Sequence, residues 1–473
     1  MAHSTSLQVR SLLCSCAGFL CACVLAPPGL DEERSRLDEA GATFDAPYEE
    51  RSIPDLPSHP TWPTWPTWRD ALERAFLANG ELEAAYFDWK AAVERVAGVA
   101  GYPNTNLAPS FGYLFSDESL KAWDRTTINV GFDAMENLAW PSKVKKAGEA
   151  ALEEARAAGQ RFLGAKFQLQ RRVLEAWLDV ALTEERMRIT REDLELLRLS
   201  AETAAASARA GGMQRDLVAA ELGVRAAENE LRNLEAEARS QRALLNGMLA
   251  RAPDAPLELP PALPEPRPLP VDDAAILAAG AHANPELAAL AAEVAGREDA
   301  LELARLAYLP DFNPFAGITG SAERMVGLVA VLPTTLPEIR SGIAEARARL
   351  REAQAMLRQA RLERAASFVA ALVVLRNAER EAAYLEGIVL PRAELLLETS
   401  RATYSAGTGR LLELIESERT LLEVRLSISE AGIERERRMA ELEELAGADL
   451  ETLFLPGSSS APRTGSEKPA LEE

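Results

Sequence analysis

The chain reads YSAGTGRLLELIE at residues 404–416, where two long helical patterns meet. One pattern extends from about Pro337 to Ser405, and the other runs from Arg410 to about Ala446. Gly407 and Gly409 stand between them, and glycine readily adopts the backbone conformations that end a helix. The stretch therefore predicts a tight turn that joins two long helices.

Both helical patterns carry a seam of apolar and small residues spaced alternately three and four apart, which is the heptad signature of a coiled coil. The alternation of large and small side chains lets neighbouring helices approach closely. The two seams are Leu414, Ser417, Leu421, Val424, Ile428 and Ala431 after the turn, and Ile343, Ala346, Leu350, Ala353, Leu357 and Ala360 before it.

The first half of the chain repeats this organisation. A helical pattern over 69–100 is followed by a strand-like region over 107–138, a helix over 142–209, the Gly211–Gly212 break and a helix over 213–250. The second half has a helix over 272–308 and a strand-like region over 312–332 before its own long helix. Asn79-Gly80-Glu81-Leu82 aligns with Asn284-Pro285-Glu286-Leu287, and Asp216 and Glu221 align with Glu413 and Glu418. The sequence thus predicts an internal duplication.

A helix over 142–209 would be about 100 Å long at 1.5 Å per residue, which no compact domain needs. The predicted shape is a rod or a tube. The strand-like segments alternate: in residues 127–134, Ile, Val, Phe and Ala share one face and Thr, Asn, Gly and Asp share the other. That pattern suits a membrane barrel and equally a sheet packed on helices. Four strands are too few to close a barrel, so a barrel requires several chains. Pro314 is expected to interrupt the third strand.

All four cysteines lie within the first 23 residues, at positions 14, 16, 21 and 23. Arg10, an apolar stretch and small residues follow the order of an export signal. Leu20-Cys21-Ala22-Cys23 is similar to a bacterial lipobox, which predicts lipidation at Cys23; the alternative is an ordinary signal peptide cut near Ala26. The cysteine spacing fits a zinc site poorly.

The segment after this signal is acidic and contains prolines. Residues 24–60 show no periodicity, so we expect an extended lead-in. Residues 61–68 repeat Thr-Trp-Pro and predict a polyproline-like strap. The strap packs against the protein's own helices or, alternatively, docks on a partner or a membrane interface.

Composition excludes several classes of function. The 473 residues include 52 Lys and Arg against 73 Asp and Glu, a formal net charge of −21, and such an acidic chain is a poor nucleic-acid binder. The three histidines have no metal-ligand spacing, and phosphate-loop, GxSxG and HExxH motifs are absent from the sequence. We therefore expect neither catalysis nor a cofactor. No stretch after residue 23 is apolar enough for a membrane-spanning helix.

Taken together, the exported chain with duplicated helix–hairpin–long helix–helix units resembles the TolC-like outer-membrane efflux proteins over roughly residues 69–450. The most specific parts are residues 404–416, Asn284-Pro285-Glu286-Leu287 and Tyr308-Leu309-Pro310-Asp311. The resemblance implies a mainly α fold with a small β part. In it, three chains contribute four strands each to one 12-stranded outer-membrane barrel, and their paired coiled coils form a periplasmic tube.

The resemblance also implies partners and functional residues. A periplasmic adaptor protein would contact the tips at Gly211, Gly212, Gly407, Thr408 and Gly409, and an inner-membrane pump would drive export. In the family, a Tyr and an Arg bond to an Asp and hold the tip closed. Tyr404 and Asp216 match that pattern, but the Arg position falls on Gly409, with Arg410 one residue later.

Two further acidic residues carry over from the family. Glu413 and Glu416 match a pair near the family's constriction, where a ring of carboxylates favours cations. The alternative for both is a solvated helix face. At the level of the whole protein, the alternative to a channel is a non-conducting, lipid-tethered coiled-coil scaffold of the cell envelope.

The expected organisation has six parts. They are a signal peptide at 1–22, a lead-in at 23–68, a first repeat at 69–252, a Pro-rich linker at 253–271, a second repeat at 272–452 and a disordered tail at 453–473.

Overall fold

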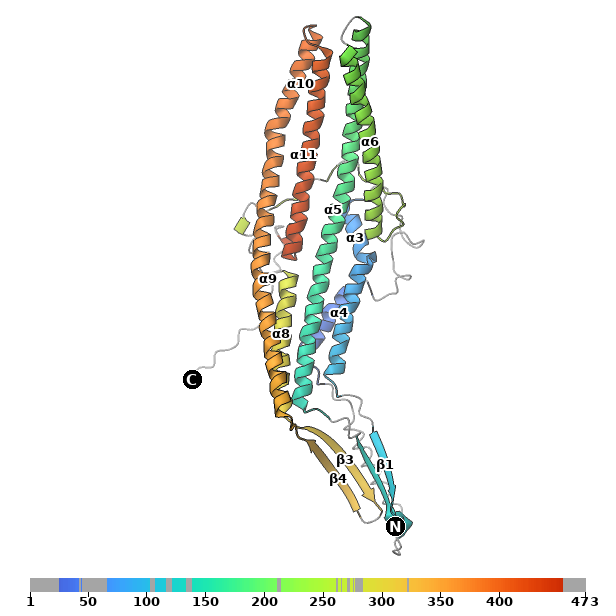
Figure 1. The fold of residues 1–473 in the computed structure, drawn as a ribbon, viewed down its shortest axis with the longest axis vertical. Coiled ribbons are helices and arrows are strands. Elements are labelled where there is room, and N and C mark those ends of the chain that lie inside the picture. The colour runs from blue at the N-terminus through green and yellow to red at the C-terminus, as the bar shows by residue number, and fades with distance from the viewer. Residues whose placement is uncertain are drawn as a thin grey trace. The chain divides into compact units, whose positions relative to one another are not determined.

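The computed structural model is dominated by long helices with one small sheet (Figure 1). It describes residues 25–41, 44, 66–102, 107–115, 121–132, 138–210, 214–260, 263–264, 266–269, 273–274, 276, 284–320 and 323–453. The predicted signal peptide, Cys23, most of the lead-in and the C-terminal tail lie outside these residues. No helix in the described part is long and apolar enough to cross a membrane.

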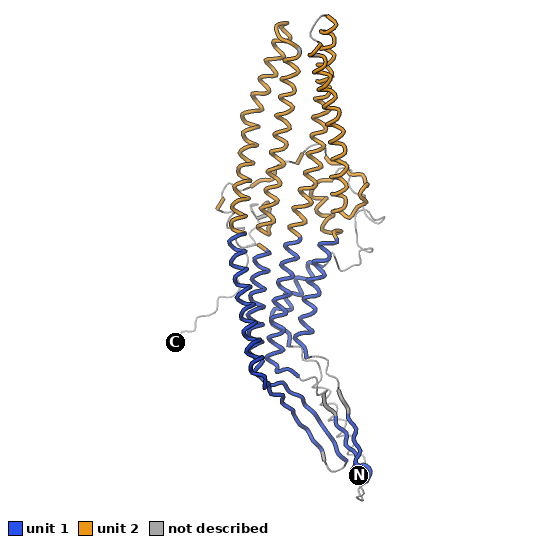
Figure 2. Tube along the Cα trace, in the orientation of Figure 1, with its two compact units in different colours: residues 1–51, 80–165, 285–363 blue, residues 52–79, 166–284, 364–473 orange. Residues whose placement is uncertain are grey.

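The chain divides into two compact units, which Figure 2 shows in different colours. Unit 1 comprises residues 1–51, 80–165 and 285–363, and unit 2 comprises residues 52–79, 166–284 and 364–473. Both units draw residues from both halves of the sequence. The duplication therefore does not correspond to two domains that follow one another along the chain.

The helices of the two repeats follow the predicted order. The first repeat contains α3 (Trp68–Ala78), α4 (Gly80–Val99), α5 (Pro141–Arg209) and α6 (Gln214–Met248). The second contains α8 (Pro285–Arg305), α9 (Leu336–Tyr384), α10 (Leu390–Ser405) and α11 (Leu411–Ala446), with a short α12 (Leu450–Leu453) after it. A single π-helical turn, η4 (Leu385–Val389), stands between α9 and α10 and was not predicted.

The single helix predicted over 69–100 is two helices, because Asn79 adopts an extended conformation with φ −74° and ψ 120°. Its side chain donates a hydrogen bond to the carbonyl of Met248 at 3.3 Å. Asn284, its predicted counterpart in the second repeat, likewise donates to the carbonyl of Leu445 at 2.6 Å. Each asparagine thus satisfies a carbonyl near the end of the last long helix of its own repeat. This shared role is the structural counterpart of the sequence alignment.

The sheet is antiparallel with strand order β1-β2-β3-β4. Its strands are β1 (Leu107–Tyr113), β2 (Thr126–Phe132), β3 (Asp311–Thr319) and β4 (Glu323–Val331). The predicted interruption at Pro314 is wrong, since β3 pairs with β4 continuously from Asp311 to Thr319. The β2–β3 pairing ends at Phe315, so that ladder does not require the amide that Pro314 lacks.

The register gives the sheet two chemically different faces, because residues paired directly across strands share a face. Phe111, Ile128 and Ile318 lie in one row with exposed side chains, and the row ends on Arg324 of β4. The neighbouring row on the opposite face contains Ser110, Asn129 and Gly317, and it ends on Met325 of β4. Thr127 and Thr319 share that polar face and their hydroxyls lie 3.2 Å apart.

The predicted heptad seams are confirmed as the least exposed faces of their helices. In α9 the six seam residues from Ile343 to Ala360 are buried or half-buried, whereas most of the residues between them are exposed. In α11 the seam packs against α10: Leu421 forms a buried cluster with Ala393 and Leu397, flanked by Leu414. Local periodicity therefore located these contact faces correctly.

The lead-in prediction is wrong for residues 30–41, which form the helix α2 (Leu30–Gly41). Its buried face consists of Leu30, Glu33, Leu37 and Gly41, a helical spacing obscured in the sequence by acidic neighbours. Glu33 is buried and accepts a hydrogen bond from Trp89 Nε1 at 2.9 Å. This hydrogen bond offsets part of the cost of burying the Glu33 carboxylate.

The Pro-rich linker packs against α11 through a buried ion-pair cluster, which we call the linker cluster: Arg267, Arg435, Glu436 and Glu443. Arg267 bonds Glu436 Oε2 at 2.8 Å and Glu443 at 2.9 and 3.0 Å. Burial raises the pKa of Glu443 to about 7, although Arg267 opposes that rise. Arg267 also lies over the Trp68 ring, 5.3 Å from its centroid.

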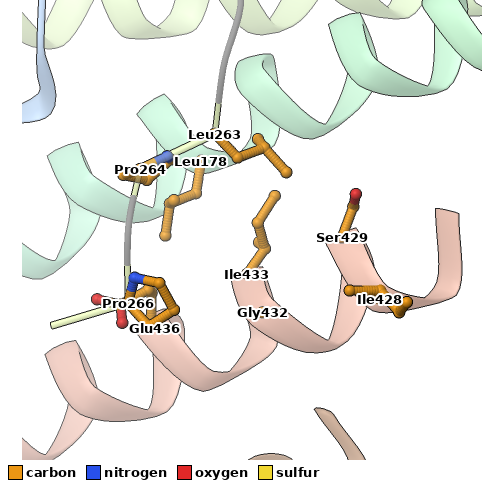
Figure 3. A pocket seen from close by; sticks show the side chains of 9 residues that line it. All are labelled: Leu178, Leu263, Pro264, Pro266, Ile428, Ser429, Gly432, Ile433 and Glu436. Atoms are coloured by element: carbon orange, nitrogen blue, oxygen red, sulfur yellow. The ribbon is translucent and has the colours of Figure 1, made fainter. Parts of the chain in front are cut away.

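Other contacts continue this packing. Trp177 Nε1 donates to the carbonyl of Pro66 at 3.3 Å, so the end of the predicted strap packs on the protein's own helices. Residues 61–65 of the strap lie outside the described residues. Beside the linker, Leu178, Pro264, Pro266 and Ile433 line a small hollow of about 150 Å³ (Figure 3).

Candidate functional site

The turn between α10 and α11 is closed by hydrogen bonds to the Tyr404 carbonyl, from the Gly407 amide at 3.0 Å, and to the Thr403 carbonyl. Thr403 O accepts from the amides of Thr408 at 3.1 Å and Gly409 at 2.9 Å, and from the Thr408 hydroxyl at 3.1 Å. Such bonds satisfy carbonyls at the end of α10 that have no partner within the helix. The turn is therefore a defined structure in which backbone and side chain both take part.

The two glycines of this turn are needed for different reasons. Gly407 has φ +74°, a left-handed conformation that side chains resist. At Gly409 a Cβ atom would lie 2.8 Å from Thr403 Oγ1 and 3.0 Å from the amide nitrogen of Tyr404. We expected both glycines to be needed for their backbone conformation. The structure shows that Gly409 is needed instead because the chain approaches itself closely.

The two candidate carboxylates lie on the exposed side of the first turns of α11. Glu413 Oε2 accepts a hydrogen bond from the Arg410 amide at 3.4 Å, so this carboxylate caps its own helix N-terminus. Glu416 follows one turn later and is also exposed, whereas Ile415 and Ser417 beside it are buried. The α10–α11 seam therefore takes the other side of the helix and leaves both carboxylates facing outward.

The other predicted gate residues are placed to different extents. Tyr404 lies in the last turn of α10 with 44% of its surface exposed, and the Arg410 side chain is also exposed. Asp216 lies in the first turn of α6, and Gly211 and Gly212 fall outside the described residues. The structure thus brings Tyr404, Arg410, Glu413 and Glu416 to one hairpin tip. Pairing of Tyr404 with Asp216 remains a prediction.

An ion pair that the sequence interpretation missed ties this hairpin together. Arg401 Nη2 of α10 bonds Glu418 Oε1 of α11 at 3.0 Å. Arg401 lies six positions before Gly407 and Glu418 lies nine positions after Gly409, so both are within reach of one another in an antiparallel hairpin. Within the described residues, no group of three or more His, Cys, Asp or Glu side chains is arranged to hold a metal ion.

Comparison with known proteins yields no match to any family model and no match to a curated protein. Solved structures do match. The outer-membrane channel OprN superposes with a TM-score of 0.66 at 18% identity, over 85% of this chain and 95% of OprN. VceC, an outer membrane protein of Vibrio cholerae, gives 0.63 at 16% identity, over 81% and 96%. The chain has the fold of the TolC-like outer-membrane channels.

A third structure with the same TolC-like fold is the open state of the MtrE outer membrane channel from Neisseria gonorrhoeae. It superposes with a TM-score of 0.63 at 17% identity, over 81% of this chain and 90% of MtrE. The prediction of a mainly α, duplicated chain with four strands is confirmed. The three matches cover 90–96% of the length of these structures.

Proposed function

We propose that three copies of this chain form an outer-membrane duct for efflux or type I export. The observation that carries the proposal is the two-faced sheet. Phe111 is 72% exposed and Val326 84% exposed, which is unusual for large apolar side chains unless another surface covers them. An apolar face directed at lipid, opposite a polar face directed at water, is the pattern of a membrane barrel. Three four-stranded sheets would give 12 strands.

The duct is passive, and its tip is where an adaptor protein would open it. In this proposal the turns at Gly407–Gly409 and Gly211–Gly212 meet a periplasmic adaptor, and an inner-membrane pump supplies the energy. Glu413 and Glu416 of three chains would place six carboxylates around the pore and favour cations. Their exposed position on α11 supports this role. The hydrogen bond by which Glu413 caps its own helix is equally expected of the alternative, in which both glutamates lie on a solvated helix face.

Anchoring to the membrane completes the proposal. Cleavage before Cys23 and lipidation of its sulfur and new N-terminus would tether the chain to the outer membrane, with the helices in the periplasm. The backbone amide of Leu25 bonds the carbonyl of Ala100 at 2.9 Å, directly after α4 and shortly before β1. Leu25, the first described residue after Cys23 in the sequence, therefore lies at the end of α4 that leads into the sheet.

A pair of neighbouring substitutions tests the duct. Phe111→Arg places a charge on the apolar face, whereas Ser110→Arg places the same charge on the polar face of the same strand. A lipid-facing arginine costs about 2–4 kcal/mol near the midplane. We expect Phe111→Arg to prevent assembly of trimers in outer-membrane fractions, and Ser110→Arg to assemble and alter conductance in planar bilayers. Equal assembly of both variants, or a wild-type trimer without conductance, would favour the non-conducting scaffold.

A further inference from the structure

Within unit 2, α5 and α11 are joined by ion pairs that recur along both helices. Four pairs of opposite charge connect them, and we call these pairs the ladder. They are Arg171–Glu444 at 2.9 Å, Asp179–Arg437, Arg186–Glu430 at 2.7 Å and Asp193–Arg419 at 2.6 Å. The pairs lie seven or eight residues apart on α5, which is the heptad repeat of a coiled coil. The helices run antiparallel, so Asp193–Arg419 is the pair nearest the hairpin turns.

The polarity of the ladder alternates from one pair to the next. Along α5 the charges are positive, negative, positive and negative, and α11 carries the complementary order. A ladder with uniform polarity would supply the same four attractions. Alternation has a further consequence, because it makes neighbouring registers unfavourable.

Displacing α11 by one heptad, about 10 Å along the helix axis, opposes like charges at the ladder positions. In one direction Asp179 meets Glu444, Arg186 meets Arg437 and Asp193 meets Glu430. In the other direction Arg171 meets Arg437 and Asp179 meets Glu430. Repulsion between such pairs disfavours the displaced registers, in the same way that complementary charges select partners in coiled coils.

The pairs inside the first hairpin do not alternate in this way. Between α5 and α6, the pairs Glu184–Arg242 at 2.6 Å, Arg191–Glu235 at 4.0 Å and Arg198–Glu228 at 3.4 Å also recur every seven residues. Two successive pairs have the same polarity. A connecting turn already fixes the register of these two helices. The alternating ladder lies between helices from different repeats, which no short turn connects.

The pair nearest the turns is held differently from the other three. On α11 the spacing from Glu430 to Arg419 is 11 residues, whereas α5 advances by only seven from Arg186 to Asp193. Glu416 and Glu423 of the same helix also attract the Arg419 guanidinium electrostatically, in addition to the hydrogen bond from Arg419 to Asp193. Breaking its bond to Asp193 therefore leaves Arg419 with other partners. We expect this pair to separate more readily than the rest.

We propose that the alternating ladder locks the register of the α10–α11 hairpin against α5, so that the tip opens by separation at Asp193–Arg419 and not by sliding. The part of this inference that concerns opening rests on the proposed duct. Register itself is a property of the folded chain and is measurable whether or not the protein conducts. Asp193 and Arg419 act as positioning residues for the tip that carries Tyr404, Glu413 and Glu416.

Register is tested with a variant that keeps every attraction and removes the alternation. All four pairs acquire the same polarity, with arginine on α5 and glutamate on α11, after four changes: Asp179→Arg, Asp193→Arg, Arg437→Glu and Arg419→Glu. Spin labels on cysteines replacing the exposed Arg188 and Arg425 report the position of α11 along α5, since all native cysteines precede residue 24. In trimers diluted with unlabelled chains, we expect one distance for the labelled wild type and a second population for the uniform variant. A single unchanged distance in the uniform variant overturns the lock.

Opening is tested with fewer substitutions in the full-length trimer. Arg419→Asp places a second carboxylate opposite Asp193. We expect the open probability in single-channel recordings to rise roughly two- to fivefold, which is the effect of losing one partly exposed ion pair. The swap Asp193→Arg with Arg419→Asp should return it to the wild-type value. If the swap is no closer to wild type than Arg419→Asp, the pair does not control opening. If the wild type itself does not conduct, the duct fails and the spin-label result still decides the register.

Discussion

Removing Arg267 from the linker cluster should lower the free energy of unfolding far more than removing a surface arginine that makes the same number of ion pairs. Arg267 is 6% exposed and bonds Glu436 and Glu443, which are also buried. Breaking a buried ion pair by deleting one partner typically costs about 3–5 kcal/mol, because a charge is left in the protein interior without compensation. We expect Arg267→Ala to lose about 3 kcal/mol, at the low end, for two reasons. Arg435 still pairs with Glu436, and Nη2 of Arg267 has no hydrogen-bond partner to lose.

Arg188→Ala is the matched control. Arg188 also pairs with two carboxylates, Glu185 and Glu192, but its side chain is 46% exposed. Exposed pairs contribute about 0–1 kcal/mol, so the two substitutions should differ by at least about 2 kcal/mol. Adding Glu443→Gln to Arg267→Ala should recover part of the loss, since it removes the uncompensated charge.

The measurement combines urea unfolding of the detergent-solubilised protein with hydrogen exchange. The amide of Arg267 donates to Glu436 Oε1 at 3.0 Å, so its exchange reports whether the linker remains on α11. We expect Arg267→Ala to accelerate exchange of the backbone amides at positions 267 and 269, since Pro266 and Pro268 have no amide hydrogen, and Arg188→Ala to leave both unchanged. Equal losses of stability in the two variants, or unchanged exchange in Arg267→Ala, would refute the assignment of the linker cluster as the main attachment of the linker.

Four other predictions concern pH, the tip and the anchor. The pKa of Glu443 is raised to about 7, so the folded state binds the proton more tightly than the unfolded state. Stability should fall by about 2 kcal/mol as pH rises from about 5 to about 7, and Glu443→Gln should flatten that slope in unfolding titrations. Gly407→Val should impair adaptor cross-linking and export while trimers persist, and wild-type values would argue against the tip assignment. The Glu413→Gln, Glu416→Gln double variant should lose cation preference, and an unchanged permeability ratio would leave both residues on a solvated face. Cys23→Ala should abolish labelling with a palmitate analogue, and retained labelling would exclude lipidation at that residue.

Most elements of the fold could be predicted from the sequence because their signals are local. The heptad spacing of Leu414 to Ala431 identified the contact face of α11, and Gly407 identified the turn. Alternation in residues 127–134 separated the two faces of β2. The helix α2 was missed because only four of its 12 residues are buried, one of them an acid. The break at Asn79 was missed because one extended residue leaves the apolar pattern almost intact.

The long helices, their seams and the glycine turn were readable in the sequence because each depends on residues within a few turns of one another, and the duplication was readable because the same local patterns recur in the second half of the chain. Which charges form ion pairs followed from the packing of the helices and the linker. The partners in Asp193–Arg419 lie 226 residues apart, and those in Arg267–Glu443 lie 176 apart. Of the many acidic and basic residues on these helices, the ones that pair are selected by register and by packing of the linker. Register and linker packing are both set when distant segments come together, and the local sequence around a charged residue does not identify its partner.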